Sequence, residues 1–203
     1  QLGFCEAYSH TFIGEAEKEV FGFNEEELWE IANPVSELNK YLRPSLAPYL
    51  LNNVKENLKN FSEIKMFEIG KVFSKKDKAQ EKLLLGIIIA GKEKTSELFF
   101  EVKGILETLL SELSVNNFSL ADSLKIVSPA LLEKLGIKAN VVLGEIDFEQ
   151  ILGTASEQKK YQPISIYPSS LRDIAVLVQE ETKALDVLEV IKQACGTLLV
   201  EVE

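Results

Sequence analysis

The chain of 203 residues has few of the side chains on which most enzyme active sites depend. It contains one histidine, His10, and two arginines, Arg43 and Arg172. A zinc site needs a cluster of Cys and His ligands, and a Ser-His-Asp site needs a histidine near a nucleophile elbow; neither pattern is present. Gly70 and Gly86 lack the spacing of a phosphate-binding loop. We therefore expect no catalytic residue and no metal ligand in this chain, and a structural or solvent-exposed His10.

Cysteine and long apolar runs are also scarce. Cys5 and Cys195 lie at opposite ends of the chain, so their spacing indicates no disulfide framework but reduced, mostly buried thiols. The longest apolar run, Leu83 to Ala90, has the length of a strand and not of a membrane span. The first residues show no secretory signal. These features predict a cytoplasmic protein without membrane contact, and the missing initial Met indicates a piece of a longer protein or a chain preceded by a tag.

The net charge of the chain restricts which molecules it can bind. The net charge is −10, which argues against a general nucleic-acid-coating protein, because phosphate binding depends on Lys and Arg. Residues 161–203 alone hold three basic and seven acidic side chains. An RNA contact in that part would have to be specific and assisted by other surfaces.

Apolar periodicity predicts an α+β core. A strand is expected over Glu6 to Ile13, and an antiparallel hairpin over Glu63 to Phe73 and Leu83 to Ala90. The next helix is expected from Ser96 to Leu113, with Leu98, Val102, Ile105, Leu109 and Leu113 facing inward. Further elements are a strand near Phe118, a strand at Leu124 to Val127, a short helix at Ala130 to Leu135 ended by Gly136, and a strand at Val141 to Ile146.

A helix from about Leu46 to Asn60, capped by Ser45, carries an apolar stripe. Its Pro48 is tolerable in the first turn, where amides have no acceptor within the helix. The stripe consists of Leu42, Leu46, Leu50, Val54 and Leu58. It could pack in the chain's own core or against another subunit.

The tail has a separate pattern. Polar residues 157–160 predict a linker, followed by a strand at Asp173 to Val178, a helix at Lys183 to Ala194 and a strand at Leu198 to Val202. This βαβ order is half of a ferredoxin-like fold. Two domains are therefore expected, at residues 1–157 and 158–203.

Several segments resemble, in order, those of bacterial phenylalanine–tRNA ligase beta subunits, although the family's His-Pro-Gly stretch before the last core strand is missing. The matching segments are Gly3–Ser9, Asn33–Ser36, Leu42–Pro48 (LRPSLAP), Met66–Phe73 (MFEIGKVF), Phe99–Gly104, Leu143–Ile146 (LGEI) and Tyr167–Val178 (YPSSLRDIAVLV). The resemblance implies a class II synthetase-like antiparallel sheet flanked by helices, followed by a truncated ferredoxin-like βαβ half-domain of an anticodon-binding domain.

The resemblance also implies a role. The family forms a complex of two alpha and two beta subunits, in which alpha activates phenylalanine with ATP and magnesium and the complex binds tRNA(Phe). A class II site would hold ATP with arginines on its second and third motifs, but neither Arg43 nor Arg172 falls in the hairpin or after Leu143-Gly144. We therefore expect a catalytically inert segment that needs no cofactor of its own and supports assembly and tRNA positioning. The main alternative is an amino-acid-binding regulatory module; a self-sufficient enzyme on an unfamiliar scaffold ranks last.

Two groups of site residues follow from the resemblance. The expected interface with alpha consists of Leu42, Arg43, Leu46, Leu50, Val54, Phe67 and Phe73. Tyr167 and Arg172 are the expected tRNA contacts, although Arg172 beside Asp173 is equally consistent with a local cap. Glu68 and Lys71 could be a remnant ligand pocket, but a polar pair that serves the sheet is the favoured reading.

Overall fold

The computed structural model describes residues 2–75, 80–115, 118–120, 123–155, 166–179, 181–200 and 202. The chain divides into two compact units, Gln1–Lys159 and Lys160–Glu203. Each unit is described by itself below.

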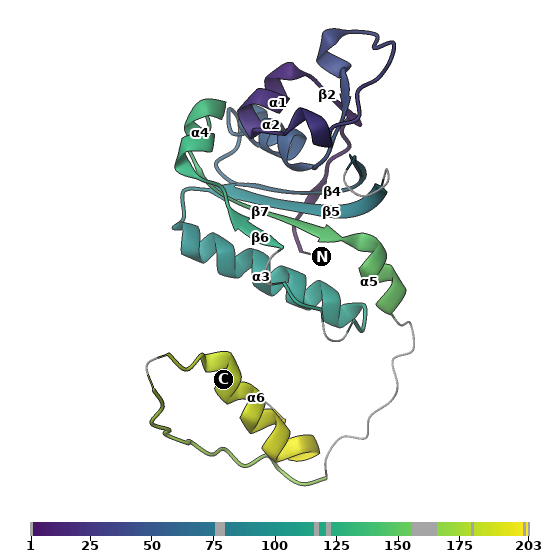
Figure 1. Cartoon of the computed structure of the whole chain (residues 1–203). Coiled ribbons are helices and arrows are strands. Elements are labelled where there is room, and N and C mark those ends of the chain that lie inside the picture. The colour runs from purple at the N-terminus through teal and green to yellow at the C-terminus, as the bar shows by residue number, and fades with distance from the viewer. Residues whose placement is uncertain are drawn as a thin grey trace. The chain divides into compact units, whose positions relative to one another are not determined.

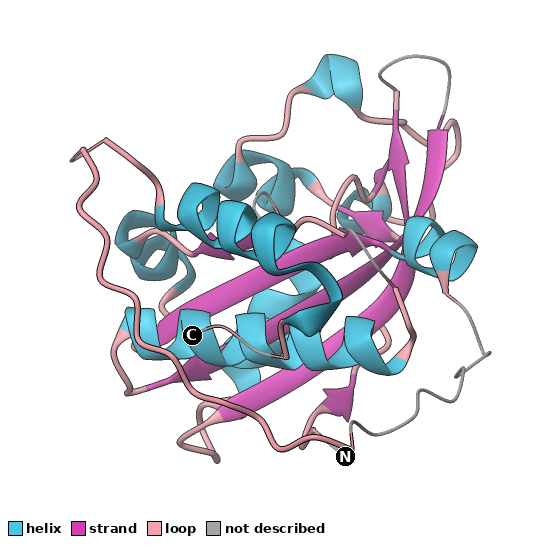
Figure 2. Cartoon of the chain, turned by 90° about the horizontal axis from the view of Figure 1, so that it is seen from below, coloured by secondary structure: helices cyan, strands magenta, loops and turns pink. Residues whose placement is uncertain are grey.

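A five-stranded sheet forms the centre of the N-terminal unit (Figure 2). The strand order is β1-β4-β5-β7-β6, and all neighbours are antiparallel except β1, which runs parallel to β4. The strands are β1 (Cys5–Glu6), β4 (Ile64–Ser74), β5 (Gln80–Gly91), β6 (Leu124–Ile126) and β7 (Asn140–Asp147). The hairpin predicted from the sequence is confirmed by the register of β4 and β5, which pairs Ile64 with Ala90 and Ser74 with Gln80.

Helices cover both faces of this sheet (Figure 1). On one face lie α1 (Glu15–Phe21), α2 (Ala47–Asn57) and α4 (Pro129–Leu135), and on the other lie α3 (Thr95–Glu112) and α5 (Phe148–Thr154). The apolar strand β5 contributes to both cores, with Ile88 facing α2 and Ile87 facing α3. Burial of both faces explains why β5 is an almost continuous apolar run and not an alternating one.

Local sequence explains where the shorter helices begin and end. Ser128 caps α4 by accepting from the Leu131 amide, and Gly136 ends this helix with φ 71°, a left-handed conformation that glycine adopts without strain. Asp147 caps α5 in the same way through the Gln150 amide. The cap of α2 is Leu46 and not the expected Ser45, although the Ser45 hydroxyl accepts from the Ala47 amide at 3.0 Å.

Beside the sheet lies a small ribbon of β2 (Phe12–Ile13) and β3 (Tyr41–Leu42). The 3-10 turns η1 (Glu25–Glu27) and η2 (Glu37–Asn39) complete it. The strand expected over residues 6–13 is therefore wrong as a single element. The hydrogen-bond ladder between β1 and β4 ends before Ser9, whose amide donates to Glu68 Oε1 at 3.4 Å. The seven-residue helix α1 was not predicted, because two turns are too short to show a clear apolar period.

The helix α3 agrees with the prediction in place, and in its inner stripe at Leu98 and Val102 only. It begins at Thr95 after Lys94, and its buried residues are Leu98, Val102, Leu106 and Leu110. The expected Ile105, Leu109 and Leu113 pack at the margin of the same core. The strand expected near Phe118 is absent from residues 118–120, and the next strand is β6.

The C-terminal unit contains α6 (Ala184–Cys195), which ends at Gly196 as expected, and the turn η3 (Gly196–Leu198). The strands expected at 173–178 and 198–202 are not formed in the described residues of these ranges. A strand needs a hydrogen-bonded neighbour, and side chains such as Ile174 and Leu177 are exposed here. The linker expected at 157–160 lies outside the described residues.

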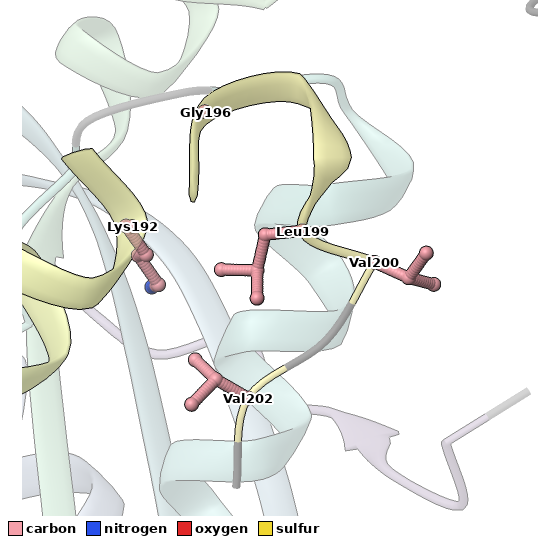
Figure 3. A pocket seen from close by; sticks show the side chains of 5 residues that line it. All are labelled: Lys192, Gly196, Leu199, Val200 and Val202. Atoms are coloured by element: carbon pink, nitrogen blue, oxygen red, sulfur yellow. The ribbon is translucent and has the colours of Figure 1, made fainter. Parts of the chain in front are cut away.

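An open hollow lies beside the end of α6 (Figure 3). It is lined by Lys192, Gly196, Leu199, Val200 and Val202. The side chains of Lys192, Leu199 and Val202 point into it, whereas that of Val200 points away. Among the described residues that line it, Lys192 alone is ionisable, so these residues offer little chemistry. Separately, none of the helices in the described residues is both long and apolar enough to cross a bilayer.

The stripe on α2 lies in the chain's own core. Leu46, Leu50 and Val54 have no exposed surface and pack against the sheet. The preference for a subunit interface at these three residues is therefore wrong, because a side chain already covered by its own sheet has no surface left for a partner.

Replacing Leu50 with Asp should unfold the N-terminal unit. The substitution removes a buried apolar side chain and places a carboxylate in the same space, which costs at least about 5 kcal/mol, comparable with the whole stability of a domain. Circular dichroism and thermal melting measure the effect. The exposed Asn52 on the same helix is the matched control, and Asn52→Asp should melt like the parent. A folded Leu50→Asp variant would show that the stripe is not core.

Candidate functional site

Two carboxylates and a glycine form one row across the sheet. The strand register pairs Glu68 of β4 with Gly86 of β5, and Gly86 with Glu145 of β7. All three lie on the face that α2 covers, since their neighbours two positions away, such as Met66 and Leu143, belong to the α2 core. The segments MFEIGKVF and LGEI therefore meet at one place, which we call the carboxylate row (Glu68, Gly86 and Glu145).

Gly86 allows α2 to pack closely against the sheet. A Cβ built at this position would lie 2.8 Å from a methyl of Leu50 and 2.9 Å from a methyl of Leu46. Any side chain on this residue would push the helix away from the sheet. The glycine is therefore required by close packing, in the middle of an otherwise apolar strand.

Arg43 and Glu68 form a buried ion pair. The Arg43 Nη1 donates to Glu68 Oε1 at 2.7 Å, and only 3% and 1% of the two side chains are exposed. The Arg43 Nε donates to the Lys71 carbonyl at 3.0 Å. A Cβ at Gly70 would collide with Arg43 Nη2, so this glycine makes room for the guanidinium. The expected pairing of Glu68 with Lys71 is wrong: Lys71 points outward and pairs with Glu81.

The backbone of Arg43 also completes the edge of β4. Its amide donates to the Thr11 carbonyl at 2.8 Å, and its carbonyl accepts from the Phe73 amide at 2.9 Å. Further along, the Trp29 indole donates to the Ser74 carbonyl at 3.3 Å. Because β1 covers only the first part of β4, these contacts take the place of a longer edge strand.

Glu145 binds the entry of α2 from the other side. It accepts from the Ser45 hydroxyl at 2.9 Å and from the Leu46 amide at 2.7 Å. Burial raises the pKa of the Glu145 carboxyl, and the hydrogen bonds from Leu46 and Ser45 oppose that rise. A carboxylate at the first turn of a helix is also favoured by the helix dipole.

The row is occupied by the chain's own groups. Among the described residues, only two buried side-chain atoms lack a hydrogen-bond partner, Glu68 Oε2 and Ser9 Oγ. Glu68 is closed to solvent, and Glu145 is engaged by the first turn of α2. The row thus holds α2 to the sheet and offers no exposed pair of carboxylates for acid–base chemistry.

A second polar network joins the ribbon to α1. The Tyr41 hydroxyl donates to Glu15 Oε1 at 2.7 Å, and Lys18 contacts Glu15 Oε2 at 2.7 Å. The ammonium groups of Lys18 and Lys40 lie 5.1 and 5.2 Å from the centre of the Tyr41 ring. The hydrogen bonds from Lys18 and Tyr41 lower the pKa of Glu15 from 4.5 to about 2, and the same network raises the pKa values of both lysines.

The other expected site residues are scattered. Leu42, Phe67 and Phe73 are partly buried, and Phe67 packs on the α3 side of the sheet, away from Arg43. Tyr167 and Arg172 are exposed in the C-terminal unit, where Arg172 donates to the Leu171 carbonyl at 2.8 Å.

The two cysteines and the single histidine all lie at the surface. Cys5 and Cys195 are free and exposed, so the expectation of buried thiols is wrong. His10 is exposed. Within the described parts of the chain, no three His, Cys, Asp or Glu side chains gather as metal ligands do.

Sequence reasoning missed most of this site. It identified each segment but not the pairing of Arg43 with Glu68 or of Ser45 with Glu145. The available signal was that the chain has one arginine in its first 171 residues, close to a helix start, and a strand with a glutamate in an apolar face. A buried glutamate requires a counter-charge, and Arg43 was the only guanidinium within that part of the sequence.

Comparison with known proteins gives one consistent family. The family model described as "Phenylalanyl tRNA synthetase beta chain CLM domain" matches residues 1–126. A phenylalanine–tRNA ligase beta subunit of Fusobacterium nucleatum is 31% identical over 95% of this chain, and that of Carboxydothermus hydrogenoformans is 28% identical over 100% of it. The chain spans only 29% and 30% of those two relatives.

Solved structures give the fold. The pyrrolysyl-tRNA synthetase from Desulfitobacterium hafniense superposes with a TM-score of 0.63 at 19% identity, over 74% of this chain and 62% of that chain. A second structure of that enzyme from the same organism gives 0.62. The chain therefore shares the mixed α/β fold of that enzyme over the part that superposes.

Replacing Glu68 with Gln should cost about 3–5 kcal/mol of unfolding free energy, because Arg43 would keep its buried charge without a counter-charge. Urea denaturation followed by the fluorescence of Trp29, the single tryptophan, measures the change. Glu56→Gln breaks the exposed pair with Lys59 and should change stability little. Equal effects of the two substitutions would contradict a special role for the buried pair.

Replacing Glu15 with Gln should make stability less sensitive to acid. The depressed pKa of Glu15 gives stability that is present above pH 4.5 and is lost as the pH falls towards about 2. The variant should be less stable than the parent at neutral pH and should show a shallower decline between pH 4.5 and 2. Melting temperatures across that range are the measurement. Glu19→Gln on the same helix is the control and should keep the parent's slope; a parental slope in Glu15→Gln would refute the network.

Proposed function

The chain belongs to the phenylalanyl-tRNA synthetase beta chain family, and from this we propose that it is a catalytically inert part of a phenylalanine–tRNA ligase beta subunit. It supports assembly with the catalytic alpha subunit and helps to position tRNA(Phe) for ATP-dependent aminoacylation. The ATP and magnesium that this reaction requires are bound elsewhere in the complex.

The buried carboxylate row is the observation that carries this proposal. In an active enzyme, polar groups on the sheet must reach a substrate. Here the Arg43 guanidinium is paired with Glu68, and the Ser45 hydroxyl and the Leu46 amide both donate to Glu145. The sheet is covered by α2 on one face and α3 on the other. Such an arrangement supports a scaffold and not a reaction centre.

The distribution of arginine gives independent support. The β4–β5 hairpin contains none, and none occurs between Glu145 and Leu171. A triphosphate needs fixed guanidinium or metal charges to offset its own. The net charge of −10 further disfavours the binding of a triphosphate.

The tail supports a role in RNA positioning only through its resemblance to an anticodon-binding domain. We propose that residues 158–203 are part of such a ferredoxin-fold domain, and that its strands form when the rest of the sheet is present. Tyr167 and Arg172 are exposed, and an aromatic ring and a guanidinium are groups on which nucleic-acid bases stack. The proposed assembly contains two alpha and two beta subunits and works in the cytoplasm.

A second candidate function rests on Ser9 and Glu68. Their buried atoms without partners, Ser9 Oγ and Glu68 Oε2, are polar groups that a small ligand such as an amino acid could satisfy. Phenylalanine would then raise the melting temperature of the isolated chain in a concentration-dependent way. An unchanged melting temperature would remove this alternative.

Co-expression with the alpha subunit of a bacterial phenylalanine–tRNA ligase tests the main proposal. Sedimentation should give a mass that contains both chains, because assembly needs no chemistry from this segment. Alpha expressed alone is the control for its own association. Two separate species, with this chain folded by circular dichroism, would contradict an assembly role for the segment.

A further inference from the structure

The segment Asn33-Pro34-Val35-Ser36 has no part in the carboxylate row, although it is one of those that resemble the family. It precedes η2 in the ribbon beside the sheet. The side chain of Val35 is 100% exposed and that of Leu38 is 73% exposed. Two branched aliphatic side chains so close in sequence and so exposed are costly in water, unless another molecule covers them.

Two further apolar side chains, Phe12 and Leu42, lie in the ribbon that η2 contacts. Phe12 of β2 lies directly opposite Leu42 of β3, so both side chains lie on the same face of the ribbon. Phe12 is partly exposed, and the turn η2, which carries Leu38, contacts β2. We call this surface the ribbon patch (Phe12, Val35, Leu38 and Leu42). It includes Leu42, one of the residues expected at the alpha interface.

The charge around the ribbon patch restricts its partner. Residues 15–40 contain eight glutamates and only two lysines, Lys18 and Lys40. Both lysines already lie in ion pairs with glutamates of the same region, such as Glu15. The surroundings are therefore acidic, and a fitting partner presents an apolar surface rimmed with Lys or Arg.

We infer that the ribbon patch is the surface on which the alpha subunit docks, through an apolar pocket with a basic rim. This inference rests on the proposed function and locates the interface with the alpha subunit on the surface of the chain. It replaces Leu46, Leu50 and Val54 of the α2 stripe, which are buried. The patch suits a protein and not RNA, because an acidic rim repels phosphates.

The test uses the beta subunit that contains this chain, together with its alpha subunit. The variant Val35→Asp with Leu38→Asp adds charge to the patch, and both positions are exposed enough to leave the fold intact. The matched control is Phe61→Asp with Phe100→Asp, at side chains that are 60% and 67% exposed. These lie beyond the end of α2 and on α3. Affinity for alpha is measured by analytical ultracentrifugation at low and high salt, and folding by circular dichroism.

The double substitution in the patch should weaken alpha binding by about tenfold or more, while the control stays within about twofold of the parent. Raising the salt should weaken the parental complex, because opposite charges meet at the rim. Unchanged binding by the patch variant, or equal losses in both variants, would overturn the inference and leave the proposed function standing. Loss of tRNA binding with assembly intact would assign the patch to RNA instead. A parent that binds no alpha would overturn the proposed function itself.

Discussion

The buried ion pair between Arg43 and Glu68 is the contact on which the arrangement of the N-terminal unit depends. It joins the residue that follows the ribbon to the middle of the sheet. Several hydrogen bonds together offset the free energy of desolvating the two charges. The guanidinium reaches a carboxylate and a strand carbonyl, while the Arg43 backbone bonds to Thr11 and Phe73. From this point the chain enters α2, whose first turn is held by Glu145. Isolated buried pairs contribute little to stability, but this one determines where the ribbon and α2 meet the sheet.

The same contact supports the proposal that the sheet of the N-terminal unit serves as a scaffold. The face under α2 carries two carboxylates, and both are used to hold the helix. Gly70 and Gly86 allow the guanidinium and the helix to approach more closely than any side chain would permit. Apart from Glu68 Oε2 and Ser9 Oγ, the buried polar side-chain atoms of the described residues are therefore engaged in packing. On the outer surface, the ribbon patch contains the two most exposed aliphatic side chains of the N-terminal unit, Val35 and Leu38.

The agreement between sequence and structure depends on the kind of element. Long periodic segments such as β4, β5 and α2 are where the sequence predicts them, because their apolar residues recur often enough to define a face. Short segments such as α1 are not, since seven residues give too little periodicity. The strands of the tail fail for another reason: Ile174 to Val178 has the composition of a strand, but a strand exists only beside a partner that accepts its hydrogen bonds.

The sequence by itself determined the apolar character of the long strands and of α2, the ends of α4 and α6 at glycine, and the scarcity of histidine and arginine. These properties follow from spacing and composition, so they can be read without knowing the fold. Only the tertiary structure decided that Arg43 meets Glu68, that Ser45 meets Glu145, and that the α2 stripe is core. These pairs are separated by 25 and 100 residues, and no local rule connects them. They come together because the strand register places Glu68, Gly86 and Glu145 in one row, and that register is a property of the whole sheet.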